Sequence, residues 1–159
     1  PDTPCHKCYA FKGRYNFPNV KDALQRRLAS LSHPRWTEAM TVLVKGKKHF
    51  RWHDSGDLQS VAHLKKIFEV CNNTPGTMHW LPTQERKLLA IIDPEVLPKN
   101  LLIRLSNAKN NTHPGKFWPY WSTVVDSGGD CPASRQGNQC RDCRRCWSRD
   151  VKHVTYPKH

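Results

Sequence analysis

Cysteine is the residue type whose spacing in this chain most clearly allows chemistry. Four cysteines fall between residues 131 and 146, and the last three form a C-x2-C-x2-C run: Cys131, Cys140, Cys143 and Cys146. Thiolates at this spacing bind a single metal ion or iron–sulfur cluster. Four of them are enough for tetrahedral zinc or for a four-iron (4Fe-4S) cluster, so the spacing predicts a metal site without choosing the metal. Disulfides or buried free thiols are the alternative, and a reducing compartment disfavours the disulfides.

A second pair of cysteines, Cys5 and Cys8, lies at the other end of the chain. Two thiolates are too few for a complete site, so the pair either shares a centre with the C-terminal cysteines or needs another ligand. His6 is an adjacent candidate, with an ordinary exposed histidine as the alternative. Cys71 is expected in the hydrophobic core, because it lies on the apolar face of a predicted helix.

The composition indicates one globular unit with a strong positive charge. The chain has 159 residues, of which 37% are apolar, and 26 basic against 13 acidic residues give a net charge of +13. This balance favours an anionic partner: nucleic acid, a nucleotide cofactor or an anionic cluster. Arg141, Arg144 and Arg145 flank the cysteines and are expected to lower the pKa of the thiols. No apolar run long enough for a membrane span and no signal peptide is present, so a cytoplasmic location is expected.

Apolar periodicity predicts alternating helices and strands along most of the chain. Strands are expected at residues 49–54, 77–81, 101–105 and 122–125, and helices at residues 20–31, 34–43, 58–71 and 85–92. Asn19 and Asp57 are placed to cap the first and third helices. Trp52 and Trp80 lie on consecutive strands, where they could stack on a base but are expected to be core residues.

This alternation predicts an α/β fold, with a partial β/α barrel-like parallel sheet in residues 1–130. A cysteine-rich, metal- or cluster-binding tail, residues 131–159, is expected to pack on it. The carboxyl ends of parallel strands share one edge, where ligands bind in such folds. That edge would carry residues 54–57, 83–85 and 106–107. Asp54 and Asp57 could form a carboxylate pair there, or serve only as strand-end and cap residues.

With these residues identified, three features resemble radical SAM enzymes. The stretch Cys5-x2-Cys8-Tyr9-Ala10 resembles the last two cysteines, and the aromatic residue after them, of the loop that holds their catalytic cluster. The turn Ser55-Gly56-Asp57 resembles the Gly-Gly-Glu turn that binds the amino group of S-adenosylmethionine. Ser106 and Asn107 resemble the polar residues that contact the ribose of that cofactor. The first cysteine of such a loop would fall at or before Pro1, which implies either preceding residues or an incomplete cluster.

The C-terminal cysteine run, Cys131-Pro132-Ala133 followed by Cys140-x2-Cys143-x2-Cys146-Trp147, resembles the tail of a phage-encoded, cysteine-rich family related to radical SAM enzymes. That family has no assigned reaction. The resemblance therefore implies a phage protein of radical-SAM-like architecture that binds an iron–sulfur cluster, with S-adenosylmethionine as a further cofactor. The composition supports an alternative: a non-catalytic, zinc-binding basic protein that binds nucleic acid or a host protein.

Overall fold

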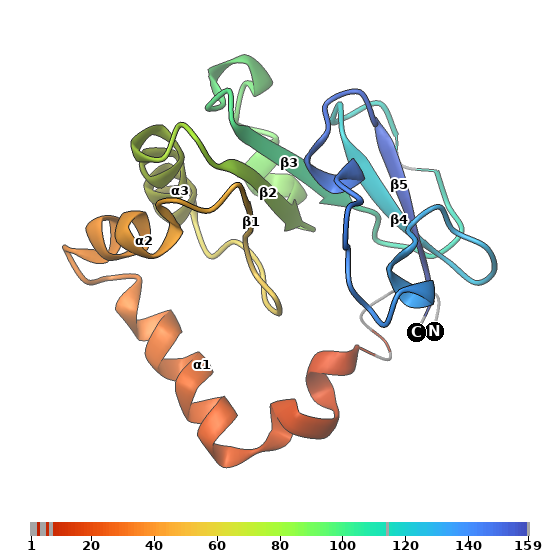
Figure 1. Ribbon diagram of the computed structural model, residues 1–159, viewed down its shortest axis with the longest axis horizontal. Coiled ribbons are helices and arrows are strands. Elements are labelled where there is room, and N and C mark those ends of the chain that lie inside the picture. Colours follow the sequence, from red (N-terminus) through yellow and green to blue (C-terminus); the bar gives the residue numbers. More distant parts are fainter. Residues whose placement is uncertain (1–2, 4–5, 7, 114, 159) are drawn as a thin grey trace.

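The structure, a computed structural model, describes residues 3, 6, 8–113 and 115–158. Its centre is a parallel sheet curled into a half-barrel, in which the strand order along the sheet equals the order along the chain (Figure 1). The strands are β1 (His49–Arg51), β2 (Met78–Thr83), β3 (Leu101–Ser106), β4 (Trp121–Val125) and β5 (His153–Pro157). The predicted α/β fold with a partial barrel-like parallel sheet is confirmed.

Two helices precede β1, and α-helices also lie in the connections from β1 to β2 and from β2 to β3. The α-helices are α1 (Pro18–Ser30), α2 (Trp36–Val44), α3 (Val61–Asn73) and α4 (Arg86–Leu89). Short 3-10 turns are η1 (Tyr9–Phe11), η2 (Gly13–Asn16), η3 (Pro94–Val96), η4 (Ala133–Arg135) and η5 (Arg145–Trp147). In Figure 1, α2 and α3 lie together beside β1 and β2, whereas α1 stands apart from the sheet and buries no residue. None of the described helices combines the length and the apolar character needed to cross a bilayer.

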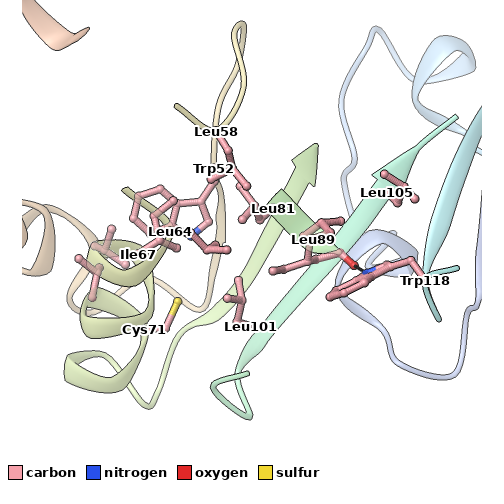
Figure 2. Close-up of a cluster of buried hydrophobic side chains, with 13 residues drawn as sticks. Trp52, Leu58, Leu64, Ile67, Cys71, Leu81, Leu89, Leu101, Leu105 and Trp118 are labelled. Carbon is pink, nitrogen blue, oxygen red and sulfur yellow. Dashed lines mark hydrogen bonds between the residues drawn. The ribbon is translucent and has the colours of Figure 1, made fainter. Parts of the chain in front are cut away.

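The helix-covered face of the sheet carries the main hydrophobic core. Successive side chains of a strand point to opposite faces, so Leu81, Ile103 and Leu105 share one face. They pack with Leu64 and Ile67 of α3 in one buried cluster. Figure 2 shows Trp52 beside α3, and Leu89 and Trp118 over β3. Cys71 and Trp52 belong to this cluster, and Trp80 is also buried, at 5% exposure, so all three core predictions are confirmed.

The opposite face of the sheet is covered by the C-terminal segment. Trp80 and Val154 are buried there with Cys146, at 7% exposure or less. Partly buried neighbours complete this second cluster: Cys131, Trp147, Val151 and Tyr156. The chain therefore folds its cysteine-rich segment onto the sheet face that the helices leave open.

Several helix and strand boundaries differ from the predicted ones, each for a physical reason. The strand predicted at residues 49–54 ends at Arg51, because His53 adopts a left-handed backbone with φ of 57°. The predicted cap at Asn19 is wrong: α1 begins one residue earlier, at Pro18, whose fixed φ suits the first helical turn. The cap predicted at Asp57 is also wrong, because α3 begins only at Val61 and the Ser60 hydroxyl accepts the capping hydrogen bond from the His63 amide.

The fifth strand was not among the predicted elements. Residues 153–157 were expected to be part of the cysteine-rich tail, with no strand among them, yet they pair with β4 over its whole length, from Trp121↔His153 to Val125↔Pro157. Gly129, just before the cysteine segment, lies against this strand with φ of 96°. A β-carbon there would meet the Pro157 nitrogen at 3.0 Å, so only glycine allows so close an approach.

Buried histidines should make the protein less stable in mild acid. Burial lowers the pKa of His63 and of His79 to about 4, whereas a histidine in the unfolded chain titrates near 6.5. Between those pH values only the unfolded chain takes up these protons. The free energy of unfolding should therefore fall as the pH drops from about 6.5 to 4, by up to about 1.4 kcal/mol per pH unit for each histidine.

Urea unfolding at a series of pH values checks this expectation. His79 is fully buried, and its Nε2 atom lies 2.9 Å from the Thr74 hydroxyl. A His79→Leu variant should show a shallower loss of stability below pH 6.5, whereas a variant of the exposed His33, His33→Gln, should keep the wild-type slope. Equal slopes in all three proteins would contradict the assignment.

Candidate metal and ligand sites

Asp57 joins the loop after β1 to the end of β2 at the carboxyl edge of the sheet. Its Oδ1 atom accepts hydrogen bonds from the Thr83 hydroxyl at 2.5 Å and the Leu58 amide at 2.7 Å, and its Oδ2 atom accepts from the Gln84 amide at 2.7 Å. Of the other residues in the predicted turn, Ser55 is half-buried, and Gly56 is exposed with φ of 87°. Asp57 is thus a bridge between two strand ends.

Asn107, directly after β3, likewise connects neighbouring elements at the carboxyl edge. Its backbone amide donates to the Ser122 carbonyl at 2.8 Å, and its side-chain amide donates to the Thr112 carbonyl at 2.6 Å. Its Oδ1 atom accepts from the Arg86 guanidinium at 3.3 Å, which links it to the helix after β2. The neighbouring Ser106 is half-buried and pairs with Ser122. The predicted edge residues therefore lie at the carboxyl ends of adjacent strands and in the loops that follow β1, β2 and β3.

Removing the charge of Asp57 should lower the stability of the protein, because the hydrogen bonds between the strand ends depend on its carboxylate. In an Asp57→Asn variant one carboxylate oxygen becomes an NH2 donor, which faces the Thr83 or Gln84 donor and leaves it unsatisfied. We expect the free energy of unfolding to fall by about 1–3 kcal/mol, measured by urea unfolding at pH 7. The same substitution at exposed Asp22 on α1 should have no measurable effect. Equal stabilities of the two variants would show that Asp57 does not tie the strand ends together.

The N-terminal cysteines are only partly within the described chain. Cys5 lies outside the described residues. Cys8 is half-buried and has a free thiol, and its carbonyl accepts a hydrogen bond from the Phe11 amide at 3.1 Å. The Tyr15 hydroxyl, in η2, donates to the Asp54 carboxylate in the loop after β1. This contact ties the N-terminal segment to the same loop that carries Ser55, Gly56 and Asp57.

The four C-terminal cysteines form a gradient from buried to exposed, and none of them is in a disulfide. Cys146 is buried, Cys131 and Cys143 are half-buried, and Cys140 is exposed. The Cys143 amide donates to the Cys140 carbonyl at 2.9 Å, which closes the C-x2-C stretch into a turn. The Cys146 sulfur lies 3.2 Å from the Tyr156 hydroxyl on β5. Among the described residues, no three His, Cys, Asp or Glu side chains are grouped closely enough to hold a metal ion.

Burial determines the acidity of the two innermost thiols. It raises the pKa of Cys146 to about 11, and it also raises the pKa of Cys131, where the nearby thiols of Cys140 and Cys143 add to the effect. The expectation that flanking arginines lower the thiol pKa is therefore wrong for these two residues. Arg145 is instead committed to an ion pair with Asp130 at 2.5 Å. The thiols nevertheless lie near enough to one another to interact electrostatically.

Arg104 fastens the cysteine segment to the sheet. It is a fully buried charged residue in the middle of β3, and burial lowers the pKa of its guanidinium. It donates hydrogen bonds to six backbone carbonyls at 2.8–3.3 Å, those of Trp121, Arg145, Cys146, Ser148, Val151 and Lys152. The residue was not identified from the sequence, although an arginine inside the apolar run 101–105 is a visible signal.

Trp147 provides a second attachment and was likewise not identified. Its indole Nε1 atom donates to the Phe50 carbonyl of β1 at 3.0 Å. Its ring packs edge-on against Trp80, with ring centroids 5.1 Å apart, and against His49, at 5.5 Å. The cysteine segment is therefore held to β1 and β2 by Trp147, to β3 by Arg104, and to β5 by the Cys146–Tyr156 contact.

Comparison with curated proteins and with solved structures gives no match. A family model described as Gene product 88 matches residues 2–123, which is most of the chain and includes β1, β2, β3 and the edge formed by Asp57 and Asn107. The matched region ends before Cys131, so it does not extend over the C-terminal cysteines. The chain belongs to the gene product 88 family, a phage-type family.

Proposed function

We propose that this member of the gene product 88 family binds an iron–sulfur cluster through Cys131, Cys140, Cys143 and Cys146, in the host cytoplasm. The observation that carries the proposal is four unpaired thiols in one segment that the fold attaches to the sheet face opposite the helices. A run of three cysteines at x2 spacing with a fourth nearby is typical of four-iron clusters. Binding requires the exposed turn of Cys140 and Cys143 to close toward Cys131 and Cys146.

The surroundings of the cysteines suit an anionic centre. A four-iron cluster or a zinc ion with four thiolate ligands carries net negative charge. Arg104 brings a positive charge beneath the segment, and its hydrogen bonds within the described chain all go to carbonyl oxygens rather than to a carboxylate. The charge of Arg104 is therefore available to offset that of the thiolates, and this compensation supports a metal centre of either kind.

Anaerobic reconstitution tests the choice of metal. The purified protein is titrated with ferrous iron and sulfide, or with zinc, while the visible spectrum is recorded. The proposal expects a brown product with absorption near ~400 nm and protection of the cysteine thiols from alkylation. Tight zinc binding with no stable coloured product would overturn the cluster in favour of a structural zinc site. Because a thiolate centre supplies folding energy, its removal by a chelator should loosen the segment from the sheet.

We further propose that the carboxyl edge binds S-adenosylmethionine. The support is the hydrogen-bonded network that joins the loops after β1, β2 and β3 through Asp57 and Asn107. Beside this network the main chain of Gly56 is exposed. Isothermal titration with S-adenosylmethionine on the reconstituted protein tests the proposal. Saturable binding that is weakened by Gly56→Val is expected, and no heat of binding would overturn this second proposal alone.

A further inference from the structure

A cluster of basic and aromatic side chains covers the edge strand β1 on the sheet face that carries the cysteine segment. We define it as the β1 patch, made of Lys48, His49, Arg51, Arg144 and Trp147. We propose that the β1 patch binds single-stranded nucleic acid, with its cations contacting phosphates and its rings contacting bases. This inference does not depend on the metal centre or on S-adenosylmethionine binding.

The patch places positive charge beside two aromatic rings, those of Trp80 and His49. The exposed Arg51 guanidinium lies 4.9 Å from the centre of the Trp80 ring, which orients it without neutralising it. Lys48 and Arg144 both lie close enough to His49 to add to the lowering of its pKa, which is chiefly due to burial. Arg144 donates to the Cys143 carbonyl at 2.8 Å, which fixes its direction.

These cations have no carboxylate partners in the described chain. The ion pairs found there are Arg35–Glu38, Arg145–Asp130 and Lys158–Asp126, and none of them involves the patch. With a net charge of +13, the protein has cationic surface in excess of its own acidic groups. Phosphates are the anions that can reach several such cations at once, and neutralising them releases counterions.

The rings favour a single strand over a duplex or an acidic protein. His49 and Trp147 are both half-buried, and their ring centroids are 5.5 Å apart. Aromatic side chains beside a basic groove stack on unpaired bases, whose faces a duplex hides. An acidic protein surface would pair with the cations but does not offer the rings a succession of exposed base faces.

Fluorescence anisotropy with labelled oligo-deoxythymidine and oligo-uridine of about 16 nucleotides tests the proposal on the protein as purified. The double variant Lys48→Gln/Arg51→Gln removes two patch cations and leaves every cysteine in place. It should bind at least about tenfold more weakly near 0.1 M salt, and the slope of log K against log salt should shrink by about 1.4. The matched control Lys21→Gln/Arg26→Gln removes the same charge from exposed α1 and should bind as the wild type does.

Three results would overturn the proposal. Equal losses in the two double variants would mean that binding follows net charge rather than the β1 patch. Tighter binding to a duplex of the same length would exclude the single-strand specificity. Absence of binding to any oligonucleotide would exclude nucleic acid and leave an acidic host protein as the class of partner.

Discussion

Replacing Arg104 with methionine is expected to detach the cysteine segment from the sheet and abolish metal binding. Methionine fills a similar volume but donates no hydrogen bond, so six backbone carbonyls lose the guanidinium donor that they share. Hydrogen bonds to charged groups contribute about 1.5–3 kcal/mol each and are not additive, so we expect at least about 3 kcal/mol of lost stability. Urea unfolding and metal content of the purified variant measure the two effects.

Two controls separate this role from a general effect of losing an arginine. Arg35 forms an exposed ion pair with Glu38 on α2, and Arg35→Met should leave both stability and metal content unchanged. Arg104→Lys keeps the charge but not the planar fork of donors, so it should recover only part of the loss. A stable Arg104→Met protein with full metal content would show that the six carbonyl contacts do not position the cysteines.

Substituting Cys146 with serine is expected to remove the metal centre while leaving the sheet folded. Cys146 is the buried cysteine of the C-terminal four, and it is held by the Tyr156 hydroxyl and by the Arg104 contact to its own carbonyl. Serine preserves size and hydrogen bonding but does not replace a thiolate as a soft-metal ligand. Metal content after reconstitution should fall to background, with far-ultraviolet circular dichroism unchanged.

Cys71→Ala is the matched control, because Cys71 is a fully buried thiol on the helix-covered face of the sheet. Burial raises the pKa of Cys71 to about 12, which keeps it a neutral core residue. This variant should lose some stability and keep its metal. Equal metal content in the Cys146→Ser and Cys71→Ala proteins would exclude Cys146 as a ligand.

The parallel strands were largely predictable because their signal is local. The strands predicted at residues 77–81 and 101–105 are found at Met78–Thr83 and Leu101–Ser106, since strands buried on both faces are rich in apolar residues. β5 was not predicted, because its pairing with β4 depends on residues some thirty positions away, such as Thr123 opposite Thr155. A short alternation of His153, Val154, Thr155 and Tyr156 was the local signal for it.

The candidate sites were predictable in composition but not in their contacts. The carboxyl edge follows from strand order alone, so Asp57 and Asn107 could be assigned to it from the sequence. Their hydrogen-bond partners could not be predicted. The position of Asp57 shortly before a helix suggested a helix cap, whereas in the structure its carboxylate accepts a hydrogen bond from Thr83, 26 positions along the chain. The role of Arg104 was harder still to predict, because its hydrogen-bond acceptors are backbone carbonyls, which no particular residue type marks in the sequence.

Iron–sulfur cluster binding by the C-terminal cysteines is tested by the iron, inorganic sulfide and zinc content of the protein purified without oxygen. Cluster binding predicts about four iron and four sulfide per chain, falling to background in Cys146→Ser and unchanged in Cys71→Ala. One zinc per chain without sulfide, or no metal of either kind, would contradict it.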